Sequence, residues 1–274
     1  MAFKQYVRAE IAAGLDETHQ FEGRAADPPG RGYYEDHLAV IRYIETCTPT
    51  LTRFLDGSGK RILESGCGTG RWMAFFETLG HTAVGVDDSA GPLRVAHAHD
   101  PRLRLARADI LACPFRDASF DAVFSSYVAE HFEDGPATLL REIHRVLRPG
   151  GLLALIVPYD NAFRRLLTNN ALRAFYALAR LRGRALAFTE YRYTCPEVER
   201  FLSAAGFRTL HCEPDDFHPP WTKGLSLDLG SVLRPPGAGP GAWELNSAGR
   251  LLARALNAIS PWTCCAGVLY IAQK

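Results

Sequence analysis

Hydrophobic and polar positions alternate between two periods along residues 61–157. Short apolar runs, typical of buried strands, are separated by stretches in which apolar residues recur at helical spacing. A sheet covered by helices on both faces produces this alternation, so the pattern predicts an α/β fold with a mostly parallel sheet. The predicted strands are Arg61–Glu64, Thr82–Asp87, Leu103–Ala106, Phe120–Ser125 and Leu152–Val157, and the predicted helices lie near residues 71–79, 89–98 and 136–147.

Residues 162–184 depart from this alternation. They contain six arginines and no acidic residue, while apolar residues recur at helical spacing. The pattern predicts a basic amphipathic segment made of two short helices that meet near Thr168. Two interpretations stay open: a solvated helix packed over the sheet edge, or a surface that covers the substrate or contacts a membrane or acidic groups.

The chain beyond residue 190 has weaker patterns. Thr194 and Glu197 have the spacing of a capping box, which predicts the start of a helix. Residues 213–246 are rich in proline and glycine and predict a long insertion of loops. The elements predicted here are a helix over residues 198–205, a strand over 208–212, a helix over Ser247–Ile259 and a strand over Gly267–Ala272.

These patterns predict one large domain over residues 61–274, with insertions at about 160–190 and 213–263. Residues 1–60 precede the sheet and are predicted to form a helical extension that contains a helix over Tyr33–Thr46. A length of 274 residues with 47% hydrophobic content is enough for one such domain with its own core.

Composition limits the class of partner. The 31 lysines and arginines nearly balance the 30 aspartates and glutamates, which argues against a nucleic-acid partner. The seven cysteines are scattered, without the spacing of a zinc site, and are predicted to be reduced thiols. The first residues lack the apolar core of a signal peptide, and the sequence contains no apolar run that would span a bilayer. We therefore expect a soluble cytoplasmic protein.

The first predicted strand ends in the most informative stretch of the chain. Glu64 is followed by glycines at alternate positions, Gly66, Gly68 and Gly70. Glycine permits positive φ and lets a ligand lie on the main chain, and the helix that follows offers its free N–H groups. Nicotinamide and flavin enzymes use G-x-G-x-x-G instead, so this spacing argues against a nicotinamide dehydrogenase.

The spacing Glu-x-Gly-x-Gly-x-Gly resembles motif I of the class I S-adenosylmethionine-dependent methyltransferases, in particular methyltransferase type 11 and ubiquinone-biosynthesis methylases. Residues 113–123 and 147–154 resemble two further segments of that family, although Cys113 stands where leucine is usual. The resemblance covers roughly residues 60–160, 190–212 and 266–274. It implies a Rossmann-like seven-stranded methyltransferase fold whose antiparallel last strand lies between strands five and six.

The resemblance also implies S-adenosylmethionine as cofactor, S-adenosylhomocysteine as its product, and no metal. Asp87 would accept both ribose hydroxyls, Asp109 would bind the adenine amino group, and Glu64 would orient the loop and the methionine amino group. Asp88 has a second interpretation as the cap of the next helix. The complete predicted cofactor set is Glu64, Gly66, Cys67, Gly68, Gly70, Asp87, Asp88, Asp109, Ile110, Ser125 and Tyr127.

The acceptor side is less determined. His131 follows the fourth strand and is predicted either to shape the cofactor pocket or to act as a general base. We expect a small-molecule acceptor, such as a lipid, a quinone-like phenol or a natural product, methylated at oxygen, carbon or nitrogen. A catalytically silent S-adenosylmethionine-binding or interaction protein is the alternative, and no oligomeric state is predicted. The aromatic candidates for the substrate wall are Tyr33, Tyr34, Tyr159, Tyr191 and Tyr193.

Overall fold

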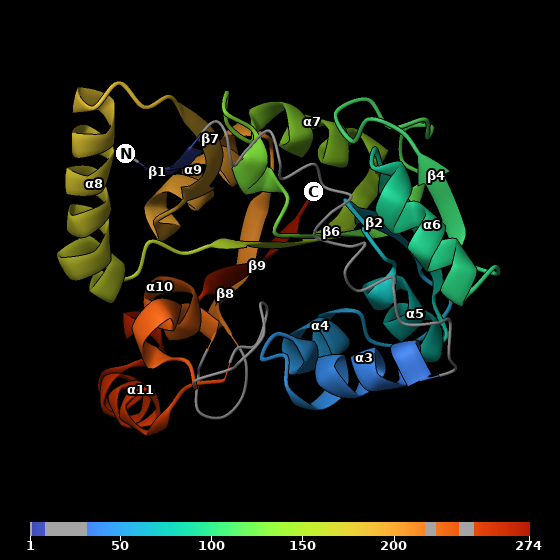
Figure 1. The fold of residues 1–274 in the computed structure, drawn as a ribbon. Helices are drawn as coiled ribbons and strands as arrows, with labels where there is room; N and C mark the ends of the chain where they lie inside the picture. The colour runs from blue at the N-terminus through green and yellow to red at the C-terminus, as the bar shows by residue number, and fades with distance from the viewer. Residues whose placement is uncertain (1, 9–31, 217–222, 236–243) are drawn as a thin grey trace.

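A seven-stranded sheet runs through the molecule in the order β4-β3-β2-β5-β6-β9-β8 (Figure 1). The computed structural model describes residues 2–8, 32–216, 223–235 and 244–274, without the side chains of residues 8, 32–37 and 231. The last strand pairs antiparallel with both of its neighbours, and the other pairs are parallel, so the predicted fold class is confirmed. The strands are β2 (Arg61–Ser65), β3 (Thr82–Asp87), β4 (Arg104–Arg107), β5 (Phe120–Ser126), β6 (Leu147–Pro158), β8 (Arg208–Asp215) and β9 (Gly267–Gln273).

Helices pack on both faces of this sheet because its strands are apolar on both sides. Along β5, Val123 joins one core cluster while Ala122 and Phe124 join the other. The first cluster includes α7 and α9, and the second includes α4, α5 and α6. These helices are α4 (Thr48–Phe54), α5 (Arg71–Thr78), α6 (Ala90–His99), α7 (Ala137–Val146) and α9 (Cys195–Ala204).

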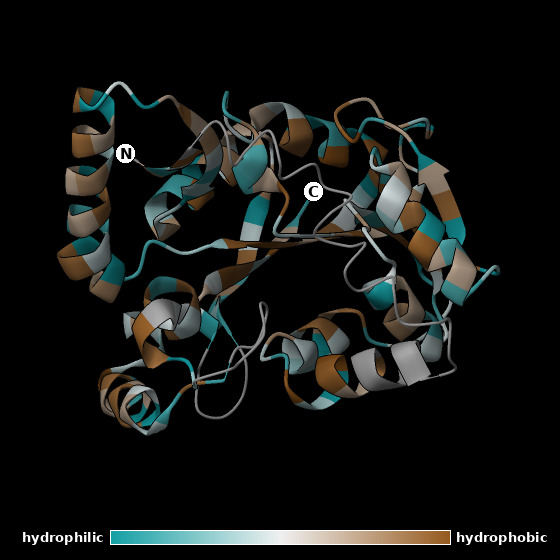
Figure 2. Ribbon diagram, in the orientation of Figure 1, coloured by the Kyte–Doolittle hydropathy of each residue, from teal (hydrophilic) through white to brown (hydrophobic). Residues whose placement is uncertain are grey.

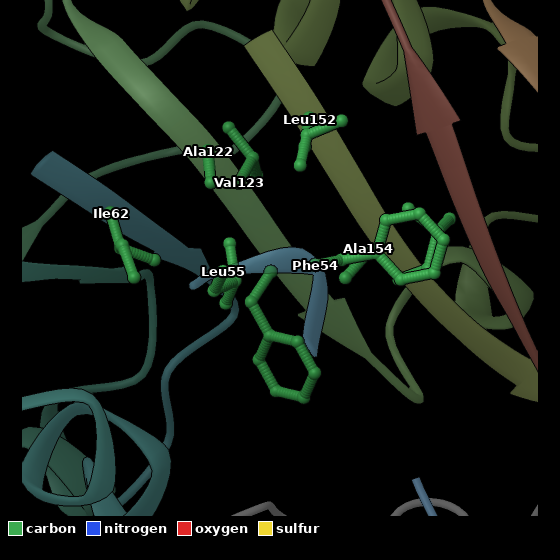
Figure 3. A pocket seen from close by; sticks show the side chains of 9 residues that line it. Phe54, Leu55, Ile62, Ala122, Val123, Leu152 and Ala154 are labelled. Atoms are coloured by element: carbon green, nitrogen blue, oxygen red, sulfur yellow. The ribbon is translucent and has the colours of Figure 1, made fainter. Parts of the chain in front are cut away.

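The end of α4 packs against the second cluster. Phe54 and Leu55 face Ile62 and Ala154 across a small apolar cavity of about 10 Å³ (Figure 3). Leu55 and Ile62 are almost fully buried, so this part of the chain before residue 61 is packed into the core of the domain. The helix α3 (Gly32–Tyr43) precedes α4, with Ile41 in the same cluster.

A second, two-stranded sheet lies outside the first. β1 (Phe3–Arg8) pairs antiparallel with β7 (Leu186–Arg192), so the extension predicted to be helical also contains a strand. The backbone N–H of Tyr6 donates to the hydroxyl of Tyr176 at 3.2 Å, which joins this sheet to α8 (Asn169–Leu181). The hinge predicted near Thr168 is instead a π-helical turn, η2 (Arg164–Thr168), which continues directly into α8.

The second insertion contains more helix than the sequence predicts. α11 (Ser247–Ile259) has the predicted bounds, while α10 (Lys223–Leu233) lies where loops are predicted. Both pack around Leu225 and Ala253 in a small third cluster. The predicted capping box opens α9. Among the residues that the structure describes, no helix is long and apolar enough to cross a membrane.

Candidate active site

The glycine-rich turn connects β2 to α5. Gly66, Gly68 and Gly70 all have positive φ, between 49° and 78°, a conformation that strains any other residue. The N–H groups of Gly66 and Cys67 donate to the carbonyl of Val86 at 2.8 and 3.0 Å, which fixes the turn against β3. The turn therefore has a defined shape that exposes its main chain at the end of the sheet.

A cavity of about 560 Å³ opens beside this turn, at the carboxyl ends of β2, β3 and β5. Open α/β sheets bind their ligands at this edge, and the volume lies within the range of small-molecule sites. Its lining residues are Glu64, Gly66, Cys67, Gly68, Thr69, Arg71, Trp72, Asp87, Asp88, Ser89, Pro92, Asp109, Ile110, Ser126, Tyr127, Val128, His131 and Phe132.

Asp87 is held in one orientation at the centre of the cavity wall. Its Oδ2 accepts the N–H of Gly68 at 2.9 Å, and its Oδ1 accepts the N–H of Ser89 at 2.9 Å. A carboxylate has about four acceptor positions, so one on each oxygen is left for a ligand. The neighbouring Asp88 is exposed and accepts the hydroxyl of Ser89 at 3.1 Å, and Ser89 itself is the N-cap residue of α6.

Glu64 is a buried residue of the cavity lining. Its Oε2 accepts the N–H of Met73 at 3.0 Å, in the first turn of α5, so the side chain orients the helix that follows the turn. Burial raises the pKa of Glu64 to about 8, although Arg71 and the N–H of Met73 oppose the shift. Its carboxyl is therefore largely protonated at neutral pH until a positive charge approaches it.

Two predicted residues that follow β4 also line the cavity. Asp109 is exposed, and its Oδ1 accepts the N–H of Leu111 at 2.8 Å, which fixes the side chain in a turn. Ile110 lines the cavity next to it. Gly70, by contrast, is not among the lining residues; it is the N-cap residue of α5, and a Cβ there would lie 3.1 Å from Leu103.

The end of β5 differs from the sequence prediction by one residue. Ser125 is fully buried within the strand, and Ser126 lines the cavity in its place. Successive strand residues point to opposite faces, so an error of one position moves a side chain from the cavity to the core.

Tyr127 lines the cavity as predicted, with an unusual positive φ of 55°. Its hydroxyl donates to Asp215 Oδ2 at 2.8 Å, and Lys223 Nζ lies 4.0 Å from the centre of its ring. This wall of the cavity is thus attached to the second insertion.

His131 lies on the same side of the cavity, in the short helix η1 (Ala129–His131). Its Nδ1 is 2.9 Å from the carbonyl oxygen of Thr189 in β7. A carbonyl only accepts, so this contact assigns the proton of the neutral ring to Nδ1 and leaves the lone pair on Nε2. The side chain is 57% exposed, and Nε2 lies 3.9 Å from Glu130 Oε1. Burial raises the pKa of Glu130 well above its usual value.

Three of the five tyrosines predicted for the substrate wall lie outside the lining of this cavity. Tyr159, Tyr191 and Tyr193 are absent from the cavity lining. Tyr193 is 2% exposed in the core, Tyr191 stacks on it at 5.6 Å, and Tyr159 packs edge-on against Trp262 at 5.3 Å. Aromatic residues at strand ends fit a core as well as a pocket, which is why their pattern misleads. Tyr33 and Tyr34 lie in α3, and their side chains fall outside the described part of the chain.

Arg71 is a cavity residue that sequence reasoning missed. Its Nη1 lies 2.9 Å from Oε1 of the buried Glu45, so the N-terminal extension supports the cavity wall. Its place as the first residue of the helix after the glycine turn is the signal that could have found it. The other lining residues outside the prediction are Thr69, Trp72, Ser89, Pro92, Ser126, Val128 and Phe132.

Within the described ranges, Glu45, Cys47 and Asp215 are close enough to share a metal ion, with ligand atoms within 4.8 Å of one another. Their chemistry does not fit one well. Glu45 already pairs with Arg71, Asp215 accepts the hydroxyl of Tyr127, and burial raises the pKa of the Cys47 thiol well above its usual value. The cluster is better explained as a buried polar contact between the extension and the insertion.

Comparison with known proteins matches residues 63–155 to the family described as a methyltransferase domain. The demethylmenaquinone methyltransferase of Corynebacterium kroppenstedtii is 31% identical over 175 residues, which cover 62% of this chain and 75% of that protein. The malonyl-acyl-carrier protein O-methyltransferase of Serratia marcescens is 36% identical over 95 residues, 35% of this chain and 37% of that protein. The chain spans 37% to 58% of the length of the first curated relatives.

Among solved structures, the 1,6-didemethyltoxoflavin-N1-methyltransferase of Burkholderia thailandensis, with bound 1,6-didemethyltoxoflavin and S-adenosylhomocysteine, is similar in fold. The TM-score is 0.53 at 20% identity, and the match covers 98% of this chain and 90% of that one. At this level of identity the likeness shows a shared fold.

Proposed function

Because the chain belongs to the class I S-adenosylmethionine-dependent methyltransferase family, we propose that it transfers the methyl group of S-adenosylmethionine to a small-molecule acceptor. The observation that carries this proposal is the geometry of Asp87. Two backbone N–H groups hold its carboxylate at the glycine turn, and each oxygen keeps one further acceptor position. A ribose offers two adjacent hydroxyl donors, which match this pair.

The residues around Asp87 suit the rest of the cofactor. A Cβ added to Gly68 would meet no atom within 4 Å, so at this position the main chain faces open cavity. Asp109 is an exposed residue of the lining and would accept the adenine amino group. Glu64 is a buried residue of the lining, and its carboxyl would face the positively charged methionine portion.

When bound, S-adenosylmethionine supplies an electrophilic methyl group on a sulfonium, so the protein mainly has to orient an acceptor and exclude water. His131 is the group of this chain that would take a proton from the acceptor. Its Nε2 carries the lone pair because Thr189 engages Nδ1. Val128 and Phe132 line the cavity beside it and would limit the access of water.

We propose that the acceptor is a small lipid, a quinone-like phenol or a natural product with an ionisable oxygen, nitrogen or carbon. The mixed wall of Tyr127, Val128, His131 and Phe132 supports an acceptor with one polar group on an apolar body. The relative named as a demethylmenaquinone methyltransferase supports a quinone-like acceptor, whereas the relative named for malonyl-acyl-carrier protein is named for an acyl group held by a carrier protein.

Calorimetry tests the cofactor site. We expect wild-type protein to bind S-adenosylhomocysteine, and Asp87→Ala to weaken binding by about tenfold or more, because two hydrogen bonds to a charged group are lost. Asp134→Ala, which removes an exposed carboxylate outside the cavity, is the matched control and should bind normally. Unchanged affinity in Asp87→Ala would place the ribose elsewhere, and no binding by the wild type would refute the proposed enzyme.

A further inference from the structure

Helix α8 exposes several apolar residues on the side away from the protein. Asn169, Tyr176 and Ala179 are buried against the rest of the molecule. On the opposite side, Leu178 is 45% exposed and Leu181 is 85% exposed. Figure 2 shows the hydrophobic residues of α8 on a helix at the left edge of the molecule. The same surface continues into η2, where Leu166 and Leu167 are 73% and 58% exposed.

An ordinary amphipathic helix leaves polar residues on its exposed side, whereas α8 carries apolar residues there as well as on its buried side. Contiguous exposed apolar side chains on a folded protein mark a surface that contacts something else. We call the exposed side chains of η2 and α8 the α8 surface. It consists of Arg165, Leu166, Leu167, Arg173, Phe175, Leu178, Arg180 and Leu181, together with Arg182 and Arg184 just beyond the helix.

The charge of the α8 surface indicates what it contacts. Residues 162–184 contain six arginines and no acidic residue. Arg164 is buried and pairs with Asp228 at 2.8 Å, and the other five arginines are exposed. Arg173 and Arg180 lie 5.3 and 5.2 Å from the rings of Phe3 and Tyr6 in β1. An aromatic ring carries no net charge, so these contacts do not neutralise the arginines.

Helix α11 shows the same combination. Leu251 and Ile259 are 69% and 77% exposed, Arg250 and Arg254 are exposed beside them, and residues 247–259 contain no acidic residue. Both helices lie on the left side of the molecule in Figure 1, away from α5 and α6.

Two other occupants fit less well. A second copy of the chain, bound through the same surface, would bring five arginines against five arginines, and like charges oppose association. Nucleic acid would pair with the arginines and leave the exposed leucines in water, since its binding is dominated by phosphate contacts.

We propose that the α8 surface docks the protein onto an anionic lipid bilayer. The leucines and Phe175 enter the boundary between head groups and acyl chains, and the arginines contact lipid phosphates. The docked helix is connected to the cavity. α8 contacts β1 through Tyr176 and Tyr6, β1 pairs with β7, and Thr189 in β7 contacts His131.

Vesicle flotation tests the proposal with full-length protein. We expect binding to vesicles of phosphatidylcholine mixed with phosphatidylglycerol, weaker binding as salt is added, and little binding to phosphatidylcholine alone. The double variants Leu178→Gln/Leu181→Gln and Arg182→Gln/Arg184→Gln should each weaken binding by about tenfold or more, because each loses two of the contacts that anchor the helix.

The control is Arg94→Gln/Arg116→Gln, which removes the same charge from exposed positions outside the α8 surface and should bind vesicles like the wild type. Circular dichroism and S-adenosylhomocysteine affinity check that each variant is folded. If the control and the arginine variant lose the same amount of vesicle binding, net charge alone explains the binding, and the proposal is overturned. Failure of the wild type to bind anionic vesicles, or binding to duplex DNA alone, would overturn it as well.

Discussion

The side chain of Asp87 is already held in a fixed orientation when no ligand is bound. Its carboxylate is fixed by the N–H groups of Gly68 and Ser89, which belong to the turns after two adjacent strands. A ligand that bonds to this carboxylate therefore has no side chain to order, and less conformational entropy is lost on binding. The same two contacts connect the turn after β2 with the start of α6.

Glu64 predicts a dependence of cofactor affinity on pH. Burial raises the pKa of its carboxyl to about 8 in the free protein, and a nearby ligand ammonium would lower that pKa. Binding then releases a proton, so affinity rises with pH below about 8, by up to tenfold per unit, and levels off above it. Calorimetry of S-adenosylhomocysteine in buffers of different ionisation heat measures this release.

The matched variants for this prediction are Glu64→Gln and Glu199→Gln. Glutamine at residue 64 cannot ionise, so proton release and the rise of affinity with pH should both disappear. Glu199 is exposed on α9, and its variant should keep both. If Glu64→Gln retains the proton release of the wild type, the titrating group is another residue.

At the scale of the element, two glycines allow the stability cost of backbone strain to be measured separately from the cost of a steric clash. Gly66 and Gly59 both have φ of 78°, yet a Cβ on Gly66 would lie 2.4 Å from Val128 whereas one on Gly59 meets nothing within 4 Å. Gly59→Ala should therefore lose about 1–2 kcal/mol of stability from the left-handed backbone alone.

Gly66→Ala should lose more than Gly59→Ala, because Val128 or the turn must also move. Denaturant unfolding of the two variants measures the difference. S-adenosylhomocysteine affinity should fall in Gly66→Ala, whose turn lines the cavity, and stay unchanged in Gly59→Ala. Equal stability losses would mean that Val128 adjusts without cost.

Elements with strong local signals could be predicted from the sequence. The turn at Gly66, the capping box at Thr194 and α11 each follow from residues close together in the chain. β1 and β7 could not, because each depends on a partner about 180 residues away and neither has a clear period of two in burial. α10 follows the same rule, since its Leu225 is buried by contacts with a distant segment around Ala253.

The candidate site divides in the same way. Motif spacing predicted Glu64, Asp87 and Asp109, all of which line the cavity. Ser125, Tyr159, Tyr191 and Tyr193 do not line the cavity, which shows what motifs leave open. The acceptor side is built by tertiary contacts, such as Tyr127 with Asp215 and His131 with Thr189, and those contacts carry no local sequence signal.

At the scale of the whole molecule, β1 forms half of the outer sheet, and the other strand of that sheet contacts the cavity residue His131. Phe3 is 6% exposed, β1 pairs along the length of β7, and β7 holds the ring of His131. Deletion of residues 1–8 should therefore loosen β7 and α8 while the central sheet stays folded. Amide hydrogen exchange should become faster in residues 186–192 and 169–181, because their hydrogen-bonded or packed partner is lost.

Strand β9 is the internal reference for the exchange rates in this experiment. Amides of β9 lie between β6 and β8 in the central sheet and should exchange as slowly as in the full chain, since no residue of β1 pairs with them. S-adenosylhomocysteine affinity should change little. The hydrogen bonds that hold Asp87 come from Gly68 and Ser89, and neither residue belongs to β1 or β7. Faster exchange throughout the central sheet would instead show that β1 stabilises the whole domain, and unchanged exchange in β7 would show that the outer sheet holds without its first strand.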